Sequence, residues 1–144
     1  MFRGFATIVF WADDLEAARD WYARVLEMEP YFSRPGPDGK TAYYEFRVGD
    51  RQDELGLIDG RFRPPPAAPG RDGTPGPGGA IMYWHVDDLE GTFARLLSLG
   101  AAEYQPVTAQ GDSGFVTAAV VDPFGNVLGI MNNPHFLEML DASA

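Results

Sequence analysis

The chain has 144 residues, of which 45% are hydrophobic and 13% aromatic, and this composition predicts one folded domain and excludes a largely disordered protein. Its formal net charge of −10 offers no basic surface to a phosphate backbone, so we expect no nucleic-acid partner. The absence of cysteine excludes disulfides and thiolate metal sites and leaves the redox compartment open, and we take a cytoplasmic location as the default expectation.

The N-terminal segment, residues 1–11, contains a short apolar run that is followed almost at once by Asp13 and Asp14. It lacks the cleavage-site pattern of a signal peptide, and we interpret it as a first strand. No apolar stretch of the chain approaches the roughly 20 residues that span a bilayer, so we expect no membrane partner.

Two segments of the chain repeat one pattern. Residues 7–26 match residues 81–100, and the Asp-Leu-Glu that starts at Asp14 recurs 74 positions later at Asp88. Such a period predicts two copies of one supersecondary unit. Residues 63–79 lie between the copies and are built largely of proline and glycine, so we interpret them as a connector.

Each copy contains a helix signal after its first strand. Asp13 with Glu16, and Asp87 with Glu90, form the Asp-x-x-Glu pattern that predicts a capping box. Each predicted helix then carries an apolar stripe with a 3.6-residue period. The stripes consist of Leu15, Ala18, Tyr22, Val25 and Leu26 in the first helix and of Leu89, Phe93, Leu96 and Leu97 in the second. The first helix has Glu27 where a C-terminal glycine is expected.

Three strands are predicted after each helix. They cover residues 29–34, 41–48 and 54–59 in the first copy and residues 102–107, 114–121 and 126–131 in the second. The order strand, helix, strand, strand, strand, used twice, predicts an α+β fold and not a parallel sheet with alternating helices. Gly56 and Gly129 interrupt the last strand of each copy, at a place where a glycine packs nothing.

The double module, with ADDLEAARDWYARVL at residues 12–26 and DPFGNVLGI at residues 122–130, resembles the vicinal oxygen chelate superfamily. This superfamily includes glyoxalase I, bleomycin- and fosfomycin-resistance proteins and extradiol dioxygenases. The resemblance covers about residues 5–131 and implies two βαβββ modules that form an open curved barrel around a central cavity, often in a homodimer. The implied organisation is a single glyoxalase-like domain made of module 5–62, the connector 63–79, module 80–132 and a C-terminal tail 133–144.

Metal-dependent members of that superfamily take ligands from the first and last strands of each module. The resemblance places these positions at Thr7, Gly56, Ile81 and Gly129, and none of these supplies a good ligand for a divalent metal. We therefore expect no metal and no other cofactor. A glycine in place of an inward carboxylate suggests room for a small molecule, whereas the alternative is that it relieves crowding or allows a β-bulge.

Strand alternation predicts the side chains that face the cavity. The candidate ligand-binding residues are Thr7, Trp11, Tyr43, Arg47, Glu54, Gly56, Tyr83, His85, Gly129 and Met131. Trp11 and Tyr83 could stack on a flat or cationic ligand, or could be ordinary core residues. Arg47 could hold an anionic group, or only pair with local acids.

His85 and Glu45 are the candidate catalytic residues, because an imidazole near Glu45 or Glu54 can transfer protons near neutral pH. The alternative is that His85 is a hydrogen-bonded structural residue. A displaced metal site made of these three residues is also left open. We expect His135 to help dock the C-terminal tail.

The leading hypothesis is a metal-free small-molecule binding protein of the glyoxalase/bleomycin-resistance type, with its ligand in an aromatic-lined cavity. It would act by sequestration or by chemistry of side chains alone, and the sequence leaves open whether any reaction is catalysed. The first alternative is a metal-dependent lyase, isomerase or dioxygenase with a displaced metal site. The second alternative is a dimeric interaction module without a ligand.

Overall fold

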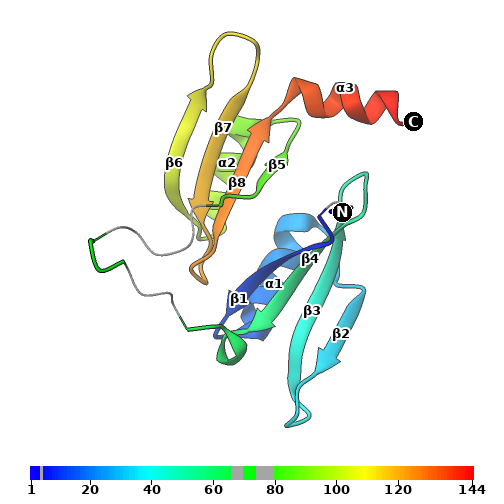
Figure 1. Cartoon of the computed structure of the whole chain (residues 1–144), viewed down its shortest axis with the longest axis vertical. Helices are drawn as coiled ribbons and strands as arrows, with labels where there is room; N and C mark the ends of the chain where they lie inside the picture. Colours follow the sequence, from blue (N-terminus) through cyan, green and yellow to red (C-terminus); the bar gives the residue numbers. More distant parts are fainter. Residues whose placement is uncertain (4, 66–69, 74–79) are drawn as a thin grey trace. The chain divides into compact units, whose positions relative to one another are not determined.

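The computed structural model describes residues 1–3, 5–65, 70–73 and 80–144 (Figure 1). The chain divides into two compact units, Met1–Pro66 and Ala67–Ala144. Each unit holds one four-stranded mixed sheet in a βαβββ module, so the predicted α+β class with two modules is confirmed. The enclosure of one cavity by both sheets depends on the placement of the modules and stays a prediction. Parts of the predicted connector, residues 66–69 and 74–79, lie outside the described residues.

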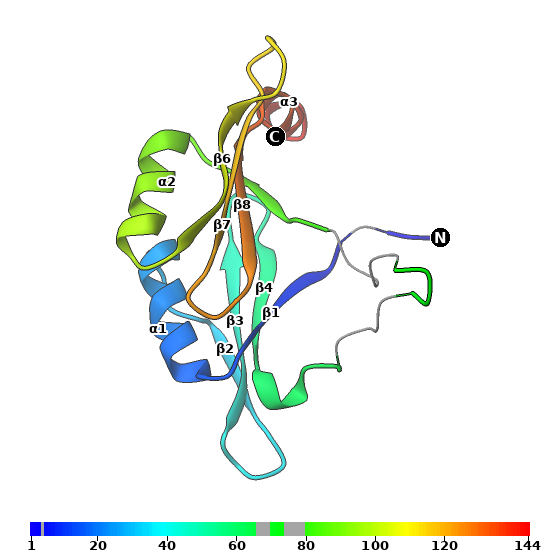
Figure 2. The same ribbon diagram turned by 90° about the vertical axis from the view of Figure 1, so that its left-hand side faces the viewer.

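The first module has a helix on one face of its sheet (Figure 2). Its elements are β1 (Thr7–Ala12), α1 (Leu15–Leu26), β2 (Phe32–Pro35), β3 (Thr41–Val48), β4 (Asp53–Asp59) and the 3-10 helix η1 (Gly60–Phe62). The strand order is β1-β4-β3-β2, in which β1 runs parallel to β4 and the other pairs are antiparallel. Tyr22 of α1 and Phe46 of β3 are fully buried in the core between the helix and the sheet.

The second module repeats this order and adds a C-terminal helix. Its elements are β5 (Tyr83–His85), α2 (Leu89–Ser98), β6 (Ala102–Ala109), β7 (Val116–Val121), β8 (Val127–Asn132) and α3 (Pro134–Ala142). The strand order is β5-β8-β7-β6, the counterpart of the first sheet. Leu96, Val120 and Leu128 are buried in its core. Leu97 was expected in the buried stripe, but it is exposed because the buried row of α2 runs through Leu89 and Leu96.

Both helices start one residue later than the sequence pattern predicted. Asp14 and Asp88, not Asp13 and Asp87, are the N-caps, and each carboxylate accepts a backbone N–H from the residue three positions on, at 3.0 Å. The glutamate of each predicted box therefore lies at the second helical position, in the first turn. There it stabilises the helix through the macrodipole and does not close a capping box.

Two turns have a defined local geometry, one at the end of α1 and one between β7 and β8. Glu27, at the expected glycine position after α1, adopts the left-handed conformation with φ 55°. Asp122, which is buried, accepts hydrogen bonds from the backbone N–H groups of Phe124 and Asn126 at 2.9 and 2.7 Å. This second turn closes the β7–β8 hairpin and fixes its register. No helix of the described residues is long and apolar enough to cross a membrane.

Candidate functional site

The strand pairing of the first module places its predicted site residues on one face of the sheet. Residues directly opposite one another on paired strands share a face. The three rows across β1, β4 and β3 are Thr7, Glu54 and Arg47; Val9, Gly56 and Glu45; and Trp11, Ile58 and Tyr43. The opposite face holds Phe46 and Leu55, which are buried in the core. The predicted alternation is therefore confirmed for these three strands.

A cavity of about 510 Å³ lies on this face of the first module. Its lining consists of Tyr31, Phe32, Arg34, Ala42, Tyr43, Glu45, Ile58 and Phe62. The side chains of Tyr31, Phe32 and Phe62 are exposed, and the rings of Phe32 and Tyr43 meet edge-on with centroids 6.3 Å apart. Exposed aromatic side chains gathered around a hollow are typical of a binding surface.

Tyr43 and Glu45 were predicted to face a cavity and line this one, whereas four aromatic or cationic neighbours were not predicted: Tyr31, Phe32, Arg34 and Phe62. The pairing of β2 with β3 would have predicted two of them, because Phe32 lies opposite Glu45 and Arg34 lies opposite Tyr43. Phe62 belongs to η1, which no periodicity signals. Thr7, Trp11, Arg47, Glu54 and Gly56 share the face but do not line the cavity.

Gly56 does not leave an open space, contrary to the prediction that it makes room for a small molecule. A Cβ atom at this position would lie 2.7 Å from both the Cε2 and the hydroxyl oxygen of Tyr43. The ring of Tyr43 therefore rests on the glycine, and the strand pairing through Gly56 runs without a bulge. Gly56 relieves crowding, which was the alternative interpretation.

Gly129 supports a tyrosine in the second module. Its Cβ would lie 2.6 Å from Cδ1 of Tyr83 and 2.9 Å from the carbonyl oxygen of Met82. The Gly129 N–H donates to that same carbonyl at 3.0 Å. Two glycines at corresponding places thus carry rings that come from different strands, β3 in the first module and β5 in the second.

Tyr43 and Glu45 form the polar centre of the first cavity. The Tyr43 hydroxyl donates a hydrogen bond to the Glu45 carboxylate. Burial raises the pKa of the Glu45 carboxyl, and the charge of Glu54 raises it further, while Arg47 acts in the opposite direction. Burial likewise raises the pKa of Tyr43. The pair offers a ligand a carboxylate oxygen as hydrogen-bond acceptor and a group able to exchange a proton.

The two arginines on this face differ in their partners. Arg47 lies 3.2 Å from a carboxylate oxygen of Glu54 and places its guanidinium 4.8 Å from the ring centre of Tyr31. It therefore pairs with a local acid, as the alternative interpretation supposed. Arg34 stands over the ring of Phe32 at 6.0 Å, and within the described residues we find no carboxylate paired with it.

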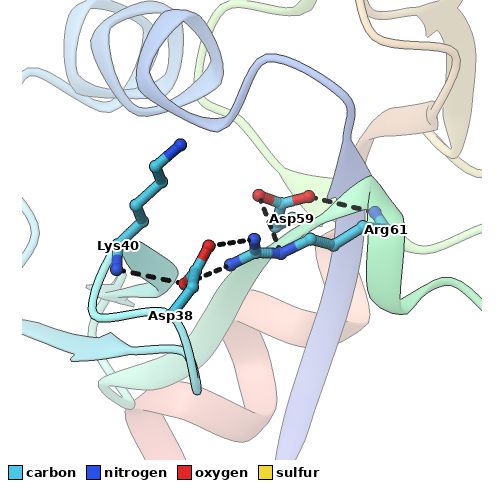
Figure 3. Close-up of polar contacts among 4 residues, drawn as sticks. All are labelled: Asp38, Lys40, Asp59 and Arg61. Atoms are coloured by element: carbon cyan, nitrogen blue, oxygen red, sulfur yellow. Dashed lines mark hydrogen bonds and ion pairs between the residues drawn. The ribbon is translucent and has the colours of Figure 1, made fainter.

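Arg61, which precedes Phe62 in the chain, forms a clamp of charged residues with Asp38 and Asp59 (Figure 3). Asp38 lies in the β2–β3 turn, and the Arg61 guanidinium donates hydrogen bonds to its two carboxylate oxygens at 2.5 and 3.0 Å. Nε of Arg61 lies 3.5 Å from a carboxylate oxygen of Asp59. The hydrogen bonds from Arg61 lower the pKa of Asp38 to about 2. The same guanidinium lies 4.8 Å from the ring centre of Phe62, so the clamp holds an aromatic wall of the cavity.

His85 joins the second sheet to the C-terminal helix. Its Nδ1 accepts the backbone N–H of Asn133 at 3.0 Å, and its ring stacks on Phe136 with centroids 5.3 Å apart. Only 8% of the side chain is exposed, and Nε2 lies 3.6 Å from Asp87. His85 therefore docks the tail, the role expected of His135, whose side chain is 67% exposed. A catalytic role for His85 stays a prediction.

A second cavity, of about 470 Å³, lies on the second module. Its lining consists of Tyr83, Gln105, Pro106, Thr108, Gln110, Thr117 and Met131. Tyr83 and Met131 were predicted to bind a ligand, whereas the two glutamines and two threonines were missed. Met131 lies opposite Thr117 as Ile58 lies opposite Tyr43, so the two cavities occupy corresponding places in the two modules.

A family model described as the Glyoxalase/Bleomycin resistance protein/Dioxygenase superfamily matches residues 4–130. The chain belongs to this superfamily. No curated protein matches the chain.

Solved structures of the superfamily share the fold. The glyoxalase family protein from Enterococcus faecalis has 20% identity and a TM-score of 0.66, covering 91% of this chain and 98% of that one. A glyoxalase-related enzyme from Fulvimarina pelagi has 19% identity and a TM-score of 0.65, with coverage of 92% and 90%. Lactoylglutathione lyase from Agrobacterium tumefaciens has 21% identity and a TM-score of 0.61, with coverage of 91% and 94%. Likeness at this identity shows the fold alone.

The residues at the superfamily's metal positions do not fit a divalent metal. Thr7 offers one hydroxyl, which lies 3.3 Å from the Glu54 carbonyl, and Ile81 has no ligating atom. Tyrosine rings rest on Gly56 and Gly129. Within the described residues, no group of three or more His, Asp or Glu side chains could hold a metal. The proposed displaced site draws Glu45 and Glu54 from one module and His85 from the other, and it stays a prediction.

Proposed function

We propose that this member of the glyoxalase/bleomycin-resistance superfamily is a metal-free binding protein for a small aromatic molecule. The observation that carries the proposal is the first cavity, in which exposed aromatic rings surround a single hydrogen-bonded carboxylate, Glu45. Small-molecule sites are usually built in this way, from apolar walls with a few placed polar groups.

The walls of the cavity suit a flat ligand. Phe32 and Tyr43 meet edge-on, and Tyr31 lies 6.3 Å from Phe32 between ring centres. A planar ring inserted here gains stacking and edge contacts of about 0.5–1.5 kcal/mol for each partner beyond the area that it buries. Glu45 then selects a ligand with an N–H or O–H group, since its carboxylate accepts hydrogen bonds and has the capacity for one more than Tyr43 supplies.

The same face argues for binding without a metal. The position that a ligating carboxylate would take is occupied by the Tyr43 ring, held over Gly56. A side chain that fills the ligand position and also lines the cavity replaces metal coordination with an aromatic contact. The protein then acts by sequestering its ligand, or by proton transfer through the Tyr43–Glu45 pair.

A test uses two naphthalenes of nearly equal size, 2-naphthol and 2-methoxynaphthalene, titrated into the full chain by calorimetry. We expect both to bind, and the methyl ether to bind about fivefold more weakly because it cannot donate to Glu45. Phe32→Ala should weaken 2-naphthol about tenfold through the lost ring contact. Tyr104→Ala is the matched control, since Tyr104 is an exposed aromatic residue that lines neither cavity.

Three results would contradict the proposal. These are no binding of either naphthalene, equal weakening by Phe32→Ala and Tyr104→Ala, and one equivalent of tightly bound divalent metal in protein purified without chelator. A change from dimer to monomer in Phe32→Ala, with no naphthol bound by the parent protein, would favour the interaction module instead. We also infer that the unmodified protein is a homodimer. Light scattering coupled to size-exclusion chromatography would measure its mass and test this inference.

A further inference from the structure

The second cavity is shaped by two irregularities in the edge strand β6. Gln105 lies opposite Ala119 and Thr108 opposite Thr117. The two β7 residues are two positions apart and share a face, but their β6 partners are three positions apart. One extra residue is therefore accommodated in β6 beside Pro106, and another lies between Glu103 and Gln105, which pair with the adjacent residues Val120 and Ala119. These irregularities resemble β-bulges, which re-aim side chains next to functional sites.

The two irregularities together decide which side chains reach the cavity, because the first brings Gln105 to the face of Ala119 and the second brings Thr108 to the face of Thr117. Strict alternation from Gln105 would bring Val107 and Ala109 to this face. With the extra residue, Thr108 and Gln110 take these places and line the cavity. Val107 lines a separate hollow together with Val116, which precedes Thr117 and so faces the other side of the sheet. The polar side chains of Thr108 and Gln110 therefore line the cavity in place of the apolar side chains of Val107 and Ala109.

These polar side chains are already held by hydrogen bonds. The Tyr83 hydroxyl donates to Oε1 of Gln105 at 2.9 Å, so the Gln105 amide N–H groups point elsewhere. Gln110 donates through Nε2 to the Thr117 hydroxyl at 3.0 Å, which leaves the Gln110 carbonyl as an acceptor and the Thr117 O–H as a donor. Thr108 donates to the Pro106 carbonyl at 2.8 Å.

We propose that this cavity is a second binding site, for a neutral ring that carries several hydroxyl groups, such as a sugar. Hydroxyl groups both donate and accept, which matches a lining that offers amide donors, a carbonyl acceptor and hydroxyls together. Tyr83 and Met131 supply the apolar surface for the C–H face of the ring. The inference does not rest on the function proposed for the first cavity.

The charge of the ligand follows from the lining, in which every side chain is uncharged. An ionic group brought into the site would lose water without gaining a counter-ion, which is unfavourable. The net charge of −10 disfavours anions further. The first cavity, by contrast, contains Arg34 and Glu45.

The test compares three sugars with the same ring and different charge: methyl α-glucoside, glucuronate and glucosamine. Each is titrated into the ¹⁵N-labelled full chain, and the side-chain amide signals of Gln105 and Gln110 are followed by NMR. We expect saturable shifts with methyl α-glucoside in the millimolar range and binding at least about fivefold weaker for the two charged sugars.

Thr117→Val removes one hydroxyl at nearly constant volume and should weaken methyl α-glucoside about fivefold. Thr41→Val makes the same change on β3 of the first module, where Thr41 lines neither cavity, and should leave binding unchanged. The dispersion of the NMR spectrum reports that each variant is folded. The proposal is overturned if no sugar shifts the two glutamine signals, if a charged sugar binds as tightly as the neutral one, or if both valine variants behave alike.

Discussion

The two modules share one topology, yet they present opposite chemistry on the face away from the helix. In the first module the cavity on this face is lined by aromatic rings with Arg34 and Glu45, whereas the lining of the second cavity is uncharged and combines Tyr83 with amide and hydroxyl side chains. Strand order is the same in both, and the register of β3 with β4 corresponds to that of β7 with β8. The edge strands β2 and β6 pair irregularly at different places, so the difference comes from the side chains and from the pairing of these edge strands. A duplicated sheet can therefore diverge in what it recognises while its core is retained.

The two glycines show the same divergence at a single position. Gly56 makes room for a tyrosine from the strand at its antiparallel side, and Gly129 for a tyrosine from the strand at its parallel side. A Cβ atom at position 56 would clash only with the side chain of Tyr43. A Cβ atom at position 129 would clash with side chains and also with the backbone carbonyl of Met82. The comparison predicts unequal tolerance of an added methyl group.

Replacing Gly129 by alanine should give the largest effect, a loss of about 3 kcal/mol in the free energy of unfolding, because the Met82 carbonyl cannot move without breaking its hydrogen bond to Gly129. Gly56→Ala should cost about 1 kcal/mol, since the Tyr43 ring can rotate away. Urea unfolding of both variants measures the difference. An equal or larger loss for Gly56→Ala would show that Tyr43 is as fixed as the backbone.

A smaller effect is expected from the connection between sheet and tail, which only the second module has. His85→Leu keeps an apolar side chain but removes the acceptor of the Asn133 N–H, so we expect a loss of about 2 kcal/mol. His135→Ala serves as control and should change the stability by less than about 0.5 kcal/mol, because His135 is exposed. Hydrogen exchange at the Asn133 amide should accelerate in the first variant alone; unchanged exchange there would argue against docking by His85.

The smallest effect concerns the clamp beside the first cavity. The pKa of Asp38 is lowered from 3.8 to about 2. The interaction of Asp38 with Arg61 therefore stabilises the folded protein fully at pH values above 3.8, and this stabilisation is lost as the pH falls through about 2. In Arg61→Met the pKa of Asp38 should return towards 3.8. A ¹³C NMR titration of the carboxyl groups measures this value; an unchanged Asp38 titration would mean that another group lowers its pKa.

Much of the architecture could be predicted because it follows from local patterns. The repeat, the helix stripes and the period-2 alternation of β3 and β4 depend on residues near one another in the chain, and the predicted rows through Gly56 agree with the observed register. The N-caps were misplaced by one residue, since two consecutive aspartates precede each helix and only the backbone decides which one caps.

The candidate sites were harder to predict because their neighbours depend on register and irregular structure. Phe32 enters the first cavity through its pairing with Glu45, and Phe62 enters it through a 3-10 turn held by Arg61. Gln105 and Thr108 enter the second cavity through two register shifts in β6, one on each side of Gln105. A glycine in a strand likewise shows that something approaches closely, but the sequence does not say whether a ligand or a tyrosine does so.

The strand orders β1-β4-β3-β2 and β5-β8-β7-β6 bear on how the protein folds during its synthesis. In both described sheets, the first strand to leave the ribosome pairs only with the last strand of its module. The β7–β8 hairpin, closed by the turn at Asp122, can form as soon as β8 emerges, because its contacts are local. β5 then completes the sheet by adding to an edge that is already built, so the second module is finished only after β8 has emerged.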